Sequence, residues 1–272
     1  MTVADDFVSF SRLIIALDPW LNQVVIIGGW AHRLYRLHSY AQALEYAPLT
    51  TRDADIAIPP TLLARGQDIR ERLLANGFTE EFLGDDQPPA THYRSGDEAA
   101  GFYAEFLTPL VGGEYDRQGR RKATVQIAGV TSQRLRDIDP LLEHPWAVDL
   151  DLAGTEKERR RVQIANPASF LAQKVLIHAK RTRDDRAKDI LYMHDTLEVF
   201  GGRLAELRDE WERRIAPQLR HRHASKVLKA SYQLFAETTD AIREAALMAV
   251  GRSVTSESLR EACQSGFKQL FG

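Results

Sequence analysis

Four consecutive β-branched residues, 24–27, are followed directly by two glycines, Gly28 and Gly29. A short, continuous apolar run of this kind is typical of a strand that is buried on both faces. The glycines predict a turn in which no Cβ separates the backbone amides from a bound group, and a helix is expected from about Trp30 to Leu37. A strand, a glycine turn and a helix N-terminus together form a phosphate-binding arrangement. The chain should therefore fold with helices packed on a sheet, and this turn is a candidate anion site.

Acidic residues occur in two later predicted strands, where they could form a cation site beside this turn. Asp53 and Asp55 begin the next predicted strand, residues 54–58, and side chains two positions apart on a strand point to the same side. Glu105 is the one acid in the apolar stretch 102–109, where its burial would be costly without a metal ion or an arginine as partner. Each feature alone also has a structural explanation, as a tight turn, a solvated strand end or a buried ion pair. Their order along the chain favours a metal-nucleotide site.

The remaining pattern predicts an α+β fold with a mixed sheet in a first domain, residues 1–165, and a helical bundle in a second, residues 166–272. After Pro167, which suits the first turn of a helix, no strand pattern recurs and four or five helices are expected. Within the first domain we expect helices over residues 5–17, 60–76 and 132–143, strands and hairpins over 78–128, and strands over 147–152 and 160–164.

Charge is divided unevenly between these two parts. Residues 1–165 contain 18 basic and 24 acidic side chains and residues 166–272 contain 18 and 14, so net charges of −6 and +4 give the −2 of the whole chain. An acidic part suits cation binding and a basic part suits phosphate binding, although ordinary surface scatter explains the division equally well. The densest basic stretch, 156–188, has ten basic and four acidic residues and would attract RNA, unless its charged helices are simply solvated.

Other candidate groups carry weaker signals. A second acid pair, Asp149 and Asp151, also has strand spacing, but no glycine turn precedes it, so we expect it mainly on a solvent face. His178 and His194 lie on predicted helices and are expected to be packing or surface residues. Cys263 is the single cysteine, which excludes an internal disulfide and a cysteine zinc site. The first residues lack a basic leader and the apolar stretches are interrupted, so no membrane span is expected and the predicted location is the cytoplasm.

In its glycine turn, its Asp-x-Asp strand and its third carboxylate, the chain resembles the DNA polymerase β-like nucleotidyltransferase superfamily. The similarity is strongest to bacterial stand-alone nucleotidyltransferases of the abortive-infection and toxin type. Later segments extend it, because such proteins carry a helix-borne lysine and a Lys-Asp pair at the positions of Lys174 and Lys188-Asp189. The resemblance covers roughly residues 20–200 and leaves the last helices unmatched.

The resemblance implies a role for each of these residues. Gly28 and Gly29, with Trp30 beside them in the turn, would hold the β- and γ-phosphates of a nucleoside triphosphate, and Lys174 and Asp189 would belong to the nucleotide site. Three acids would bind two Mg²⁺ ions, with Mn²⁺ as an alternative, and would be the catalytic residues: Asp53, Asp55 and Glu105. Two positions depart from the family pattern, because Trp30 replaces a small or hydroxylated residue and Glu105 replaces an aspartate.

The implied activity is that of an EC 2.7.7 enzyme, in which an acceptor hydroxyl attacks the α-phosphate and pyrophosphate leaves. The toxin-type relatives imply an acceptor on tRNA, on another RNA or on a protein, and an antitoxin protein as partner. Antibiotic-modifying relatives would instead imply a small molecule. A catalytically silent module that binds a nucleotide or a partner protein is the alternative from another class, and a purely structural helical adaptor is the third.

Overall fold

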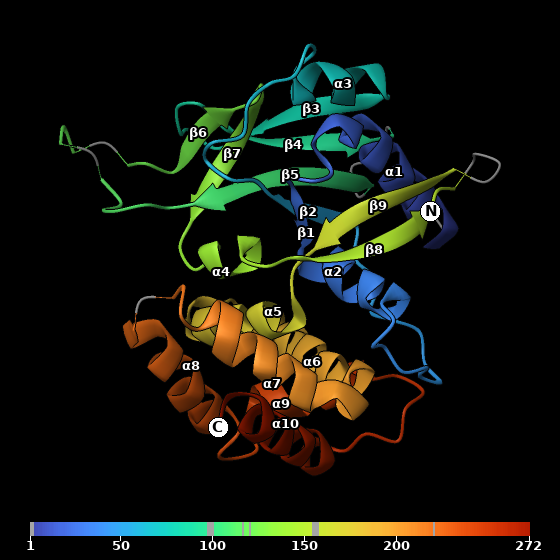
Figure 1. The fold of residues 1–272 in the computed structure, drawn as a ribbon, viewed down its shortest axis with the longest axis vertical. Helices are drawn as coiled ribbons and strands as arrows, with labels where there is room; N and C mark the ends of the chain where they lie inside the picture. Colours follow the sequence, from blue (N-terminus) through green and yellow to red (C-terminus); the bar gives the residue numbers. More distant parts are fainter. Residues whose placement is uncertain (1–2, 97–100, 116, 120, 154–157, 220) are drawn as a thin grey trace. The chain divides into compact units, whose positions relative to one another are not determined.

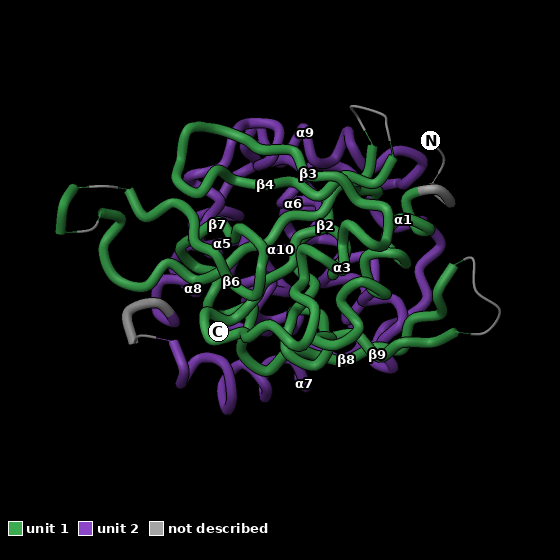
Figure 2. Tube along the Cα trace, turned by 90° about the horizontal axis from the view of Figure 1, so that it is seen from above, with its two compact units in different colours: residues 1–31, 50–165 green, residues 32–49, 166–272 purple. Residues whose placement is uncertain are grey.

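The computed structural model describes residues 3–96, 101–115, 117–119, 121–153, 158–219 and 221–272. These residues form two compact units (Figure 2): a sheet unit, residues 1–31 and 50–165, and a helical unit, residues 32–49 and 166–272. The helical unit thus includes residues 32–49, which the sequence analysis assigned to the first domain. Whether each unit is a domain that folds independently stays a prediction.

The strands of the described residues form one mixed sheet of nine, and the predicted α+β class is confirmed. The main path of the sheet has the order β3-β4-β5-β2-β1-β9-β8, with β7 beside β5 and β6 beside β7 (Figure 1). The strands are β1 (Val25–Ile27), β2 (Asp53–Ala57), β3 (Phe78–Leu83), β4 (Ala90–Ser95), β5 (Phe102–Pro109), β6 (Thr124–Ile127), β7 (Val130–Leu135), β8 (Trp146–Asp151) and β9 (Arg159–Ile164).

One face of the sheet is covered by α1 (Val3–Ala16) and α3 (Ile69–Ala75). On β2, β4 and β5 the buried side chains alternate with half-buried polar ones, as the period of two requires. The buried set packs under α1, where Phe10 stacks on Trp30 with ring centroids 3.8 Å apart and Trp30 meets Phe102 edge to face. The polar set therefore lies on the opposite face.

The glycine turn and the acid pair are brought together by strand register. β1 pairs antiparallel with β2, so that Ile27, the residue before Gly28, lies opposite Asp55. β2 pairs parallel with β5, and there Asp55 lies opposite Glu105. These two pairings place the turn and two of the three predicted acids at one point of the sheet.

The prediction of a helix over residues 132–143 is wrong. Residues 130–135 form β7, which pairs with β6 and β5, and only α4 (Asp139–Leu142) is helical. Ala128 and Gly129 both have positive φ, 48° and 89°, as a two-residue hairpin turn between β6 and β7 requires. Asp137, at φ 64°, then interrupts any helix before α4. The predicted helix over 60–76 is also shorter than expected, because α3 begins only at Ile69, after its N-cap Asp68.

The helical unit begins within α2 (Gly28–Leu34), whose first four residues belong to the sheet unit. After residue 165 the described residues contain six α-helices, more than the four or five expected: α5 (Pro167–Ile177), α6 (Arg183–Val199), α7 (Leu204–Glu210), α8 (His221–Leu234), α9 (Asp240–Met248) and α10 (Ser256–Phe271). α6 packs against α5, α9 and α10 and is buried along most of its length. In the described part of the chain, no helix is both long and apolar enough to cross a membrane.

Candidate active site

Gly28 leaves room for the Asp55 carboxylate beside it. Its φ is +61°, a left-handed conformation that glycine adopts without steric cost. A Cβ on Gly28 would overlap Asp55 Oδ2 and would lie only 3.1 Å from Asp55 Cγ. The missing side chain therefore makes room for the Asp55 carboxylate at the turn, in addition to the backbone access expected from the sequence.

Glu105 accepts hydrogen bonds from groups on neighbouring strands. Gln133 on β7 donates from Nε2 to Glu105 Oε2 at 2.7 Å, and His92 Nε2 on β4 lies 3.5 Å from the same oxygen. The carboxyl groups of Glu105 and Asp55 are within hydrogen-bond reach of each other. Burial alone would raise the pKa of Glu105, but these three contacts together hold its pKa below the usual value. Glu105 is therefore kept as a carboxylate.

Asp53 lies two residues before Asp55 on β2, on the same face of the sheet. Thr51 donates its hydroxyl to Asp53 Oδ1, and Asp53 lies opposite Tyr103 on β5. The Tyr103 ring stacks on His92 with centroids 4.2 Å apart. Burial raises the pKa of Tyr103, and the negative charges of Asp53, Glu105 and Asp55 raise it further, so the phenol stays protonated beside the acids.

Sequence reasoning missed His92, Tyr103 and Gln133 as parts of this site. Gln133 was hidden because its segment was assigned a helical period, whereas it lies on a strand. His92 and Tyr103 lie at alternate positions of their strands, on the face that carries Glu105. The alternation is visible in the sequence, but the register that sets His92 beside Glu105 is a tertiary feature.

The structure places Trp30 away from solvent. Its indole is fully buried in the stack with Phe10, so any contact of Trp30 with a phosphate would come from its backbone N–H. This explains how a large side chain is accommodated after the glycine turn, because it fills the core under α1 instead of the site.

Lys174 and Asp189 lie in the helical unit and bind each other. Lys174 on α5 donates from Nζ to Asp189 Oδ1 on α6 at 2.6 Å, and both side chains are buried. Arg181 Nε lies 3.3 Å from the other carboxylate oxygen of Asp189, and the Lys174 ammonium also lies over the rings of Phe170 and Tyr192. The pair thus stabilises the α5–α6 packing, and its predicted role in nucleotide binding stays a prediction.

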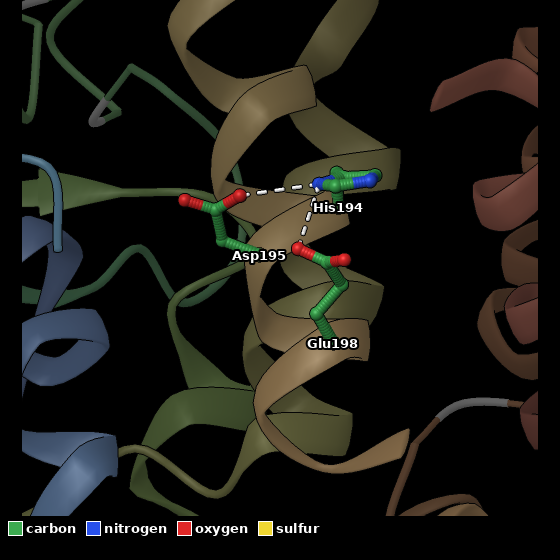
Figure 3. Close-up of side chains that lie close together, drawn as sticks. All are labelled: His194, Asp195 and Glu198. Atoms are coloured by element: carbon green, nitrogen blue, oxygen red, sulfur yellow. Dashed lines mark hydrogen bonds and ion pairs between the residues drawn. The ribbon is translucent and has the colours of Figure 1, made fainter. Parts of the chain in front are cut away.

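A second polar cluster in the helical unit is formed by His194, Asp195 and Glu198 on α6 (Figure 3). Asp195 Oδ1 accepts hydrogen bonds from Arg252 Nη1 at 2.6 Å and from Tyr46 at 3.3 Å, and His194 Nδ1 lies 3.1 Å from the same oxygen. Burial would raise the pKa of Asp195, but its bonds to His194 and Arg252 hold it below the usual value. The sequence predicted His194 as a packing or surface residue and did not predict this cluster. The i,i+4 spacing of His194 and Glu198 could have indicated it.

A sequence model of a nucleotidyltransferase family matches residues 6–216. The chain belongs to this nucleotidyltransferase family. The predicted enzyme class is thereby confirmed, and the substrate is a nucleotide. No curated protein matches the chain. Membership of the polymerase β-like superfamily and of the abortive-infection type stays a prediction, as do the roles of the individual site residues.

Nucleotidyltransferases commonly use divalent metal ions, and the acid set of this enzyme fits such ions. Two carboxyl groups held as close as Asp55 and Glu105 need a proton or a cation between them, and Gly28 leaves space for a carboxylate there. The ligand oxygens of Asp53, Asp55 and Glu105 do not all lie within 4.8 Å of one another, since the one group of described residues that meets this condition is on α6.

The α6 cluster fits a metal ion poorly. The oxygen of Asp195 that would bind the ion already accepts from the guanidinium of Arg252, and the corresponding oxygen of Glu198 accepts from Tyr46. Arg252 thus supplies the positive charge that a buried carboxylate requires. The α6 cluster is therefore explained by internal packing, and a cation site in the sheet unit stays a prediction.

Proposed function

We propose that the enzyme transfers a nucleoside monophosphate from a nucleoside triphosphate to an acceptor hydroxyl, in a polymerase β-like site. The acceptor oxygen forms a bond to the α-phosphorus, the bond from that phosphorus to the β-phosphate oxygen breaks, and pyrophosphate leaves. The observation that carries the proposal is the register that sets Gly28 against Asp55 and Asp55 opposite Glu105. The family match over residues 6–216 supports the reaction class.

Asp53, Asp55 and Glu105 would hold two Mg²⁺ ions, or Mn²⁺ in their place. When bound, these ions would neutralise the negative charge that the triphosphate brings to the site. The residues of the chain position this set: Thr51 donates to Asp53, and Gln133 fixes Glu105. The proton of the acceptor hydroxyl would pass to one of the three carboxylates. The turn at Gly28 and Gly29 would hold the β- and γ-phosphates.

We propose that the acceptor is RNA, for example tRNA, as in the toxin-type relatives. A hydroxyl group on a protein is the alternative acceptor. We also propose that the enzyme acts in the cytoplasm and has an antitoxin protein as a partner. The residues that first suggested RNA support an RNA acceptor less than their charge implied. Arg181 pairs with Asp185 and Asp189, and Arg183 pairs with Glu244. Glu156 and Lys157, at the start of the basic stretch, lie outside the described residues.

The decisive experiment incubates the protein with each radiolabelled nucleoside triphosphate, Mg²⁺ and total RNA, and measures both label transfer and pyrophosphate release. Asp53→Asn and Asp55→Asn should abolish both. Asp149→Asn and Asp151→Asn are matched controls, because this pair has the same spacing on β8 but is exposed, and these variants should keep wild-type activity. Lack of triphosphate binding in the presence of Mg²⁺ or Mn²⁺, or equal activity of all four variants, would contradict the proposal.

A catalytically silent nucleotide-binding module is the second candidate. The observations that favour it are the two departures from the family pattern, the buried indole of Trp30 after the turn and the longer side chain of Glu105. Tight triphosphate binding without turnover, unchanged by Asp53→Asn, would support it against the enzyme.

A further inference from the structure

A cavity of about 530 Å³ lies where the edge strand β8 and its neighbour β9 meet the segment that precedes β1. Its polar lining comes from three separate segments of the sheet unit: Asp18, Asn22, Arg65, Arg160, Arg161 and Gln163. None of these residues belongs to the acid site described above, and Arg160 and Arg161 belong to the arginine run that the proposed reaction does not use.

Hydrogen bonds hold the walls of this cavity in place. Gln163 on β9 donates from Nε2 to the carbonyl oxygen of Asn22 at 2.9 Å. Trp20, which is fully buried, donates from Nε1 to the carbonyl oxygen of Leu63 at 2.9 Å and so fixes the segment that carries Arg65. Arg65 itself donates to the carbonyl oxygen of Pro19 at 3.3 Å. The cavity is therefore a built feature of the sheet edge and not a gap between independent loops.

The charge of the lining is strongly positive. Three arginines and one acid, Asp18, line the cavity. Arg160 lies 2.8 Å from Asp18 and 3.4 Å from Glu158. Arg65 and Arg161 have no carboxylate within ion-pair distance among the residues that the structure describes. This positive cavity stands in a stretch of chain, residues 1–165, whose net charge is −6. Two guanidinium groups without an acidic partner are the usual recognition groups for phosphate, because their planar donors match its oxygens.

We propose that this cavity binds backbone phosphates of an RNA acceptor, an inference that rests on the proposed nucleotidyl transfer. The wall residue Asn22 precedes Gly28 by six residues of one segment, so the two points are at most about 20 Å apart. The phosphates of the triphosphate are already provided for at the glycine turn. A second phosphate site at this separation, beside the first but not part of it, suits a long polyanion whose end reaches the acids and whose body lies along the sheet edge.

The test measures binding of a fluorescent single-stranded RNA of mixed sequence over a series of KCl concentrations. Arg65→Ala and Arg161→Ala should each weaken binding by about tenfold and should reduce the slope of log K against log salt by about 0.7. Arg159→Ala is the matched control, because Arg159 pairs with Asp151 at 2.7 Å and does not line the cavity. It removes the same charge and should change binding less than twofold. In the transfer assay, the cavity variants should raise KM for RNA and leave kcat unchanged.

Equal losses for Arg159→Ala and Arg161→Ala would overturn the inference, because they would reflect net charge alone. Binding of tripolyphosphate is measured in parallel. If tripolyphosphate binds through Arg65 and Arg161 but RNA does not, the RNA proposal is also overturned. If RNA fails to bind but the wild-type protein still binds triphosphate and releases pyrophosphate, the cavity proposal fails and the proposed function stands. If RNA binds through the arginines but the acid variants change no transfer, the proposed function fails instead.

Discussion

Replacing Gly28 by alanine tests whether the turn and the Asp55 carboxylate form one unit. An L-residue at φ +61° costs roughly 1–2 kcal/mol in the left-handed region. The new Cβ would also overlap Asp55 Oδ2, and moving that side chain off its rotamer costs about 1 kcal/mol. The free energy of unfolding should therefore fall by about 2–3 kcal/mol. Because Asp55 is displaced from the site, transfer activity should fall by about 100-fold or more.

Gly84→Ala separates the two contributions. Gly84 has a similar φ, +71°, but nothing lies within 4 Å of the position that its Cβ would take. Urea unfolding of this variant should show the backbone cost alone, roughly 1–2 kcal/mol, with unchanged activity. Adding Asp55→Ala to Gly28→Ala should recover about 1 kcal/mol, since the colliding carboxylate is then absent, and a double-mutant cycle would measure this coupling. If Gly28→Ala is no less stable than Gly84→Ala, or retains transfer activity, the reasoning about Asp55 is refuted.

Three further changes have defined outcomes. Gln133→Leu removes the donor to Glu105 Oε2 and should lower kcat by about tenfold, roughly 1.4 kcal/mol, with a smaller effect on triphosphate binding; an unchanged kcat would exclude a positioning role. Burial lowers the pKa of His32 to about 4, so the unfolded chain takes up a proton below pH 6.5 that the folded chain takes up only near pH 4. Stability should therefore fall by about 2 kcal/mol between pH 7 and pH 5 through this residue, and His32→Leu should flatten that part of the urea-denaturation profile. Arg252→Met deprives the buried Asp195 of its charged partner and should cost about 3 kcal/mol in thermal unfolding, whereas a chelator should leave the unfolding of the wild-type helical unit unchanged.

The local part of this site could be predicted from the sequence because its signals are local. A β-branched strand ending in Gly28-Gly29 and an acid pair on a strand depend on neighbouring residues only, and both elements are present. The single acid in an apolar strand, Glu105, was found for the same reason. Gln133 was missed because residues 132–143 contain enough apolar side chains to fit a helical period, whereas the hairpin at Ala128-Gly129 commits the segment to a strand. Register decides the partners of each acid, and no pattern within one segment encodes it.

Residues 32–49 connect the glycine turn to the acid pair, and they belong to the helical unit. The number of residues between Gly28 and Asp53 therefore does not indicate how the turn and the acids are arranged. The chain leaves the sheet unit within α2, just after the glycine turn, and returns at Thr50, shortly before the strand of Asp53. In between, Gln42 donates its backbone N–H to the carbonyl oxygen of Val199 at 2.9 Å, and Arg36 donates to the carbonyl oxygen of Tyr46 at 2.6 Å. Tyr46 in turn bonds Asp195. The segment that connects Gly28 to Asp53 is therefore fastened to α6, and its length is set by packing in the helical unit and not by the chemistry at either of its ends. The carboxylates of α6 thus anchor this connection, and Arg252 supplies the positive charge that the buried Asp195 requires.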